Sequence, residues 1–110
     1  MSDGVTVVAG FAESLGAPEA AWSLVDAGHR VVCFSRRGAR AALRKSGSVG
    51  VLEVASPEED ADGCVREVME LCAREGAAAL MAWDDTSVWV CEEARRAGVA
   101  APIASASGEL

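Results

Sequence analysis

Apolar residues along this 110-residue chain alternate between short continuous runs and stretches with helical periodicity. Such runs are typical of strands buried on both faces of a parallel sheet, and the periodic stretches are typical of the helices that connect them. The runs predict strands at residues 6–9, 31–35, 49–54 and 78–83, with a candidate edge strand at 102–105. The expected fold class is α/β: a three-layer α/β/α, Rossmann-like parallel sheet of four or five strands.

Helix start and stop signals lie between these runs. Pro18 suits the first turn of a helix and Gly28 a left-handed stop, which predicts a helix over 18–27. A short helix is expected over 39–45. Pro102 places the last strand at an edge of the sheet, because proline cannot donate to an interior ladder.

The run Ser56-Pro57-Glu58-Glu59 has the pattern of a capping box with a proline inside it. It predicts the start of a long amphipathic helix that stops at Gly76.

The last helix is expected to begin with a cap from Asp84 or Asp85 and to end at Gly98. Val88, Cys91 and Ala94 recur at helical spacing, so they are expected to form its inward face.

A chain of this length supports one domain, residues 1–110, and its 51% hydrophobic content is enough for a core. A second, catalytic domain does not fit within these residues. No run approaches the roughly 18 apolar residues that a membrane span requires, and residues 1–4 lack the features of a signal peptide. A cytoplasmic location without membrane contact is the expectation.

The net charge of −7 is unevenly distributed along the chain. Residues 1–50 carry four acids and six bases, whereas residues 51–110 carry thirteen acids and four bases. Nucleic acid is therefore not an expected partner of the whole chain. The six bases lie in a window without acids, between Arg30 and Lys45. They face either a phosphate or acidic surface, or simply solvent.

The four cysteines show neither CxxC nor Cys/His spacing, and each lies in a predicted strand or apolar helix face. We interpret them as reduced core residues. His29 is the single histidine, so the sequence offers few residues for a histidine-based metal site or nucleophile pair. The sequence predicts no metal ligands and no catalytic residues.

Ligands of doubly wound sheets collect at the carboxyl ends of the strands, which makes the loops there the candidate binding site. The loop of residues 10–16 has two glycines but lacks the middle glycine of GxGxxG, and no GK[ST] follows it. Simple helix capping is the alternative role for the two aspartates after the fourth strand. The candidate substrate- or cofactor-binding residues are Gly10, Glu13, Ser14, Gly16, Arg36, Arg37, Asp84 and Asp85.

The stretch VVAGFAESLGAPEAAWSLVDAGHRVVCFSRR resembles the start of a short-chain dehydrogenase. That resemblance implies glycines at positions 10, 14 and 16, but Ser14 stands at the middle one. It also implies that Arg36 and Arg37 contact the 2′-phosphate of NADP. The chain has no tyrosine, so the family's catalytic Tyr-x-x-x-Lys is absent and a complete dehydrogenase is ruled out.

A second resemblance covers nearly the whole chain. AGHRVVCFSRR, then VASPEEDADGCVREVMELCAREGAAALMAWDD, then VWVCEEARRAGVAAPIASASGEL together resemble the N-terminal, Rossmann-like (pre-ATP-grasp) domain of ATP-grasp carboxylate-amine ligases. The resemblance implies a non-catalytic module that frames the carboxylate-substrate side and docks on a grasp domain, in cis or in trans. ATP and magnesium are then expected only in that grasp domain, and no cofactor in this chain.

Two other functions stay open. One is a small nucleotide- or phosphate-binding domain of Rossmann type that uses residues 10–16, Arg36 and Arg37. The other is a ligand-free dimerisation or scaffold domain. Trp22 and Trp89 flank the inward stripes of their helices, where they form either the edge of the core or a docking surface for a second copy or a catalytic partner.

Overall fold

The fold is built around one five-stranded, all-parallel sheet, in a computed structural model that describes residues 4–39 and 47–104. The strands are β1 (Thr6–Gly10), β2 (Arg30–Arg36), β3 (Val49–Val54), β4 (Ala79–Ala82) and β5 (Ile103–Ala104). Their spatial order is β3-β2-β1-β4-β5, so β1 is central and the strand order reverses between β1 and β4. The short helix expected over 39–45 lies almost wholly outside the described residues.

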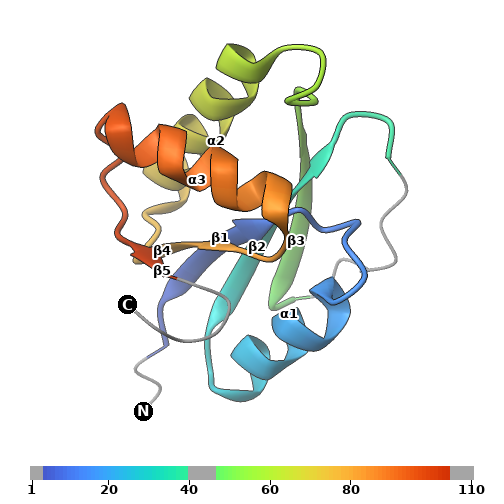
Figure 1. Ribbon diagram of the computed structural model, residues 1–110. Coiled ribbons are helices and arrows are strands. Elements are labelled where there is room, and N and C mark those ends of the chain that lie inside the picture. The colour runs from blue at the N-terminus through green and yellow to red at the C-terminus, as the bar shows by residue number, and fades with distance from the viewer. Residues whose placement is uncertain (1–3, 40–46, 105–110) are drawn as a thin grey trace.

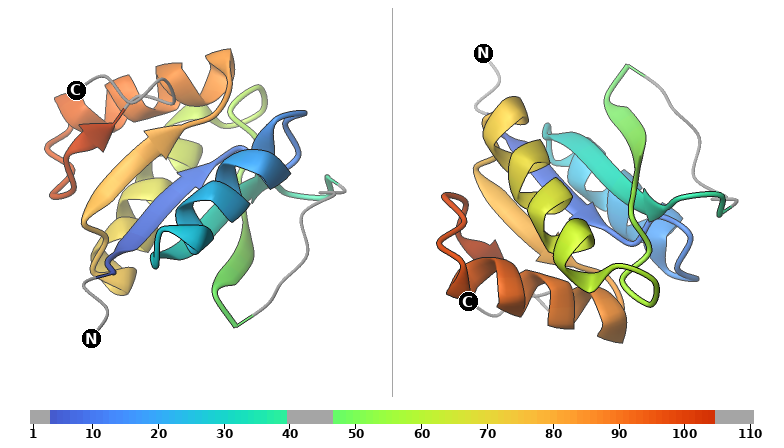
Figure 2. Two further views of the ribbon diagram at one scale, coloured as in Figure 1. Left: turned by 90° about the horizontal axis from the view of Figure 1, so that it is seen from below. Right: turned by 90° about the horizontal axis from the view of Figure 1, so that it is seen from above.

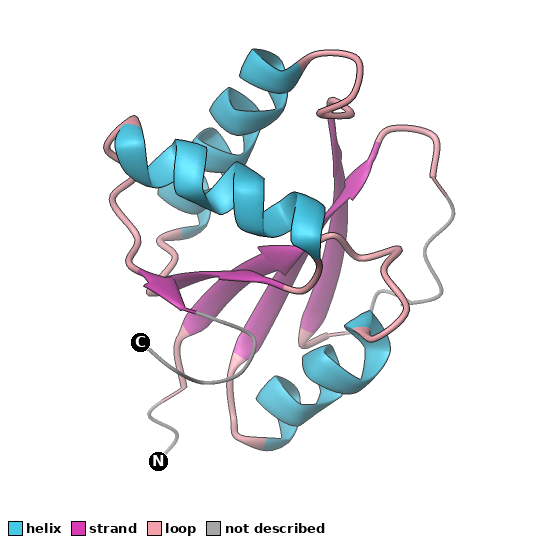
Figure 3. Cartoon of the chain, viewed as in Figure 1, coloured by secondary structure: helices cyan, strands magenta, loops and turns pink. Residues whose placement is uncertain are grey.

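Helices cover both faces of this sheet. They are α1 (Ala17–Asp26), α2 (Ala61–Glu75) and α3 (Asp85–Arg96). Figure 1 shows α2 and α3 above the sheet and α1 below it, and the two views of Figure 2 show the same division from below and from above. Figure 3 shows how loops connect each helix to the strands on either side of it. The predicted α/β, Rossmann-like, three-layer fold is thus confirmed, as is the position of β5 at an edge.

Successive side chains of each strand point to opposite faces of the sheet, which gives one apolar layer on each face. Val8, Val32, Phe34 and Leu80 point to the α2 and α3 side and belong to the larger core cluster. The smaller cluster lies between α1 and the sheet and contains Val31, Cys33, Val49, Ala12 and Ala21. Because successive side chains of a strand face opposite sides, a sheet covered by helices on both faces needs continuous apolar strands.

All four cysteines are buried and form no disulfide, which confirms that they are core residues. Burial raises the pKa of Cys33 and Cys91 to about 12, and that of Cys64 and Cys72 to about 11. Since the thiolate is the reactive form, these thiols are inert as nucleophiles near neutral pH.

The helix after β3 starts later than the sequence predicts. Ser56 does not cap it: the Ser56 carbonyl accepts hydrogen bonds from the backbone N–H groups of Glu59 (3.0 Å) and Asp60 (2.8 Å), which closes a turn. The helix begins at Ala61, and Asp60 is its cap, accepting from the Gly63 N–H at 2.9 Å. The predicted stop at Gly76 is confirmed, with a left-handed φ of 63°.

The buried face of α3 is also rotated relative to the prediction. Cys91 and Ala94 are buried as expected, but Val88 is 56% exposed and Val90 is fully buried instead. α3 packs against α2 as well as against the sheet, so two contacts rather than one select its inward face.

Candidate functional site at the carboxyl edge of the sheet

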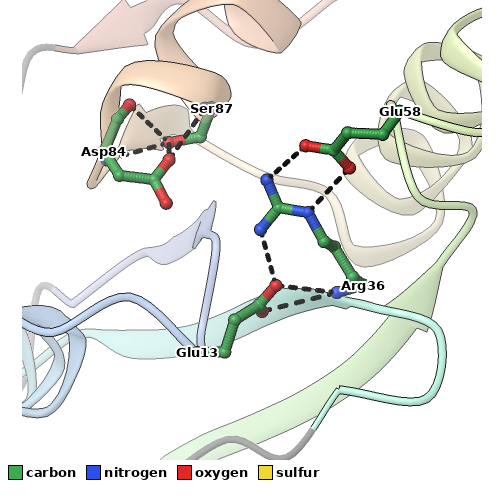
Figure 4. Close-up of polar contacts among 5 residues, drawn as sticks. All are labelled: Glu13, Arg36, Glu58, Asp84 and Ser87. Atoms are coloured by element: carbon green, nitrogen blue, oxygen red, sulfur yellow. Dashed lines mark hydrogen bonds and ion pairs between the residues drawn. The ribbon is translucent and has the colours of Figure 1, made fainter.

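Charged residues from three loops meet where the parallel strands end. Glu13 follows β1, Arg36 closes β2 and Glu58 follows β3. Figure 4 shows the Arg36 side chain between the two glutamates, with Asp84 and Ser87 at the start of α3 drawn in the same view. The sequence prediction that the loops after β1 and β2 share one edge is confirmed for Glu13 and Arg36.

Arg36 is the centre of this cluster. Its Nε donates to Glu58 Oε1 at 3.0 Å and its Nη2 to Glu58 Oε2 at 2.9 Å, a bidentate pair. Its Nη1 donates to Glu13 Oε2 at 2.8 Å, and its backbone N–H lies 3.4 Å from both oxygens of that carboxylate. The guanidinium carbon lies 4.2 Å from the centroid of the Phe11 ring, within cation–π range.

The cluster has more negative than positive charge, with two carboxylates around one guanidinium. The Arg36 side chain is 24% exposed and that of Glu13 only 15%, whereas that of Glu58 is 58% exposed. The hydrogen bonds that Arg36 donates to Glu58 and Glu13 raise the pKa of Arg36, which keeps it charged. The Arg36 hydrogen bond holds the pKa of Glu58 below its ordinary value. Three of the five N–H donors of the guanidinium are bonded to carboxylates, so a phosphate would compete with Glu13 and Glu58 for Arg36.

The lowered pKa of Glu58 predicts a pH-dependent contribution to stability. A carboxyl group with a lower pKa in the folded state stabilises the fold fully above its unfolded-state pKa of about 4.3, and loses that effect as pH falls through the folded value. We expect Glu58→Gln to cost less than about 0.5 kcal/mol at pH 7, because the pair is exposed, and less than that at pH 2. Urea denaturation of both proteins at the two pH values tests this; a pH-independent difference would contradict it.

Arg37, the other arginine for which the dehydrogenase resemblance implies a phosphate contact, points to a different partner. Its side chain is 59% exposed, and its Nη2 lies 3.5 Å from Glu67 Oε2 on α2. The other Glu67 oxygen accepts the backbone N–H of Ala55 at 2.6 Å. Glu67 thereby ties the end of β3 to α2, and Arg37 adds a weak outer contact.

The loop of residues 10–16 has glycines for different reasons. A Cβ on Gly10 would lie 2.5 Å from the buried Phe34 ring, so Gly10 is required by packing. A Cβ on Gly16, the first residue before α1, would meet nothing within 4 Å. Ser14 Oγ is buried and has no hydrogen-bond partner among the described residues. No glycine of this loop is needed for a close approach between parts of the protein's own backbone.

Asp84 and Ser87 cap α3 reciprocally. Asp84 Oδ1 accepts the Ser87 backbone N–H at 2.8 Å and the Ser87 hydroxyl at 2.7 Å. The Ser87 hydroxyl oxygen in turn accepts the backbone N–H groups of Asp84 (3.0 Å) and Trp83 (3.1 Å). Asp85 is exposed in the first turn, where a negative charge complements the helix dipole. The capping role considered for the aspartates is therefore confirmed for Asp84.

This cap is testable by substitution. We expect Asp84→Ala to destabilise the fold by about 1–2 kcal/mol, because it leaves α3 without its cap, whereas Asp84→Asn retains an acceptor and costs much less. Asp85→Ala is the neighbouring control, with an expected loss below about 0.5 kcal/mol. Thermal unfolding of the three variants measures these losses of stability. Equal losses for Asp84→Ala and Asp85→Ala would refute the capping role.

The sequence prediction missed Glu58 and Phe11, which contact Arg36, and Glu67, which pairs with Arg37 outside the cluster. A signal for Glu58 exists, since the acids at 58–59 follow the strand next to the one that ends in Arg36-Arg37. Opposite charges after adjacent parallel strands are placed at one edge and attract each other. No comparable signal in the sequence indicates that the Phe11 ring lies against the guanidinium.

Among residues 4–39 and 47–104, no group of three or more His, Cys, Asp or Glu side chains has the geometry of a metal site, and no helix has the length and hydropathy of a membrane span. The chain has no significant match among protein-family models, curated proteins or solved structures.

Proposed function

We propose that this chain is a non-catalytic, Rossmann-like module that acts beside an ATP-grasp catalytic domain, in the same polypeptide or in a separate one. The observation that carries the proposal is the closed Glu13–Arg36–Glu58 cluster. It occupies the edge where a Rossmann-type domain binds its nucleotide, and both of its carboxylates are hydrogen-bonded by the Arg36 guanidinium. The resemblance along the chain to the N-terminal domain of ATP-grasp ligases agrees with this role.

In this role the carboxyl edge borders the substrate side of a composite active site. Glu13, Glu58 and Asp85 give that border a negative charge, offset only in part by Arg36. Such a border suits contact with an amine or with backbone N–H donors better than contact with a phosphate. ATP and magnesium are assigned to the grasp domain.

The test is reconstitution. The purified chain is added to the ATP-grasp domain encoded downstream of residue 110 or in a neighbouring gene, and ADP release is followed with candidate carboxylate and amine substrates. We expect turnover at least ~10-fold higher with the chain than without it, which corresponds to about 1.4 kcal/mol in the barrier. If no such domain is encoded there, or if its turnover is indifferent to the chain, the proposal fails.

A nucleotide-binding function makes a different prediction. ATP, NADP or AMP at millimolar concentration would raise the melting temperature of the isolated chain if any of them bound the folded state selectively. We expect no shift, because the only part-buried guanidinium at this edge within the described residues is held by two carboxylates. A clear shift with any of the three would favour the nucleotide-binding alternative.

A further inference from the structure

A groove of about 600 Å³ runs between α2 and α3 on the outer side of the molecule. Both helices lie on the same face of the sheet and pack against each other, as the right-hand view of Figure 2 shows. Val65, Met69 and Ala73 of α2 and Trp89 of α3 supply its apolar lining. None of the residues Glu13, Arg36 and Glu58 lines this groove, but Glu58 lines a neighbouring hollow that shares Ala61 and Trp89 with it.

Part of this lining also packs on the core: Val65 and Met69 lie partly buried against the larger core cluster, whereas Ala73 and Trp89 are exposed. α2 already buries Cys64, Val68, Leu71 and Cys72, and α3 buries its own separate set. Trp89 nevertheless remains 45% exposed at the groove. Large aromatic side chains that are left exposed beside an apolar hollow are typical of protein–protein contact sites.

The rim of the groove is acidic. Asp62, Glu70 and Glu93 line it together with one base, Arg66. Among the described residues, Asp62 and Glu70 make no ion pair, whereas Glu93 pairs with Arg96 at 3.3 Å. The neighbouring hollow of about 440 Å³ adds two more acidic residues, Asp85 and the Arg36-paired Glu58. A basic partner surface would complement this charge.

The geometry points to the groove as the docking site for an amphipathic helix with an apolar ridge and Lys or Arg on both flanks. A furrow between two helices accepts a third helix through residues at i, i+3, i+4 and i+7, and the acidic rim selects the basic flanks. Under the proposed function, this helix belongs to the partner catalytic domain. The chemistry of the contact, an apolar furrow with an acidic rim, follows from the groove alone.

A designed peptide tests the groove directly. The probe is a helical peptide of about 15–20 residues with a leucine ridge and lysine flanks, and its control has the same ridge with glutamate flanks. Calorimetric titration into the full chain is expected to give at least tenfold tighter binding of the lysine peptide. Equal affinity for both peptides, or no binding of either, would overturn the proposal.

Two tryptophans provide matched variants for this titration. Trp89 is 45% exposed in the groove and Trp22 is 43% exposed on α1, on the other face of the sheet. Trp89→Ser is expected to weaken the lysine peptide by about tenfold or more, and Trp22→Ser to leave its affinity unchanged. The Asp62→Lys, Glu70→Lys double variant is expected to reverse the preference between the peptides. Equal losses at the two tryptophans would contradict the assignment of the groove.

Two further measurements separate this inference from the proposed function. If the grasp domain is stimulated but the lysine peptide does not bind, the groove assignment is wrong while the proposed function stands. If the peptide binds and Trp89→Ser leaves grasp-domain turnover unchanged, the groove is confirmed as a helix site but not as the site for that partner. If light scattering shows a dimer that Trp89→Ser converts to a monomer, the occupant is a second copy and the inference fails.

Discussion

Replacement of Arg36 by methionine is expected to lower the free energy of unfolding by about 2 kcal/mol, measured by urea denaturation at pH 7. Methionine fills similar space and keeps contact with the Phe11 ring, but it removes three side-chain hydrogen bonds to carboxylates. Glu13 then remains a largely buried carboxylate without its charged partner. Most of the lost stability is expected to come from Glu13, because the exposed Glu58 carboxylate is hydrated once its arginine partner is gone.

Arg37→Met is the matched control for this substitution. Arg37 is the next residue, but it is mostly exposed and makes one ion pair at 3.5 Å, so we expect a loss below about 0.5 kcal/mol. Adding Glu13→Gln to Arg36→Met should recover part of the stability, because no charge is then left buried. Equal losses at Arg36 and Arg37 would show that the cluster contributes no more than an ordinary surface ion pair.

Replacement of Gly10 by alanine is expected to cost a similar amount, about 2 kcal/mol, through overpacking. The new methyl group would lie 2.5–2.8 Å from three atoms of the Phe34 ring. That ring is fully buried and stands edge-on to Phe11, with 5.0 Å between the ring centroids, so it can yield to the methyl group only by displacing its core neighbours. Thermal unfolding of the variant measures the loss.

Gly16→Ala in the same loop is the control. Its methyl group meets no atom within 4 Å, and the Gly16 φ of −89° is accessible to alanine. We expect a change below about 1 kcal/mol, since alanine is a poorer residue than glycine at the start of a helix but restricts the unfolded chain. A loss at Gly16 as large as that at Gly10 would show that the loop, rather than the Phe34 contact, is sensitive to substitution.

The sequence predicts those elements whose signals are local. The third strand is found at residues 49–54, as predicted from its apolar run, and the stop at Gly76 is found where the glycine permits a left-handed turn. The predicted start of α2 is wrong because the Glu58 side chain pairs with Arg36, at the end of β2, and does not join the first turn of the helix. Its bonds to Arg36 and the turn at Ser56 hold this segment outside the helix, and Asp60 replaces the serine as the cap.

The candidate site was predictable in its place but not in its chemistry. The rule that parallel strands end at one edge was enough to bring Glu13 and Arg36 together. Whether an arginine faces a ligand or a carboxylate depends on residues more than twenty positions away, as Glu13 and Glu58 are. A single sequence contains the charges but not their pairing, so it leaves Arg36 open to a phosphate, an acidic surface or solvent.

The central place of β1 has a consequence for synthesis on the ribosome. β1 pairs with β2 soon after both have emerged, but its other edge must wait for β4, which follows α2 in the chain. Until then Val7, Val8 and Ala9 present an unpaired, apolar strand edge, the kind of surface on which nascent chains associate. The acidic α2, which is made just before β4, adds negative charge to the growing chain during this interval and so opposes contact between neighbouring copies.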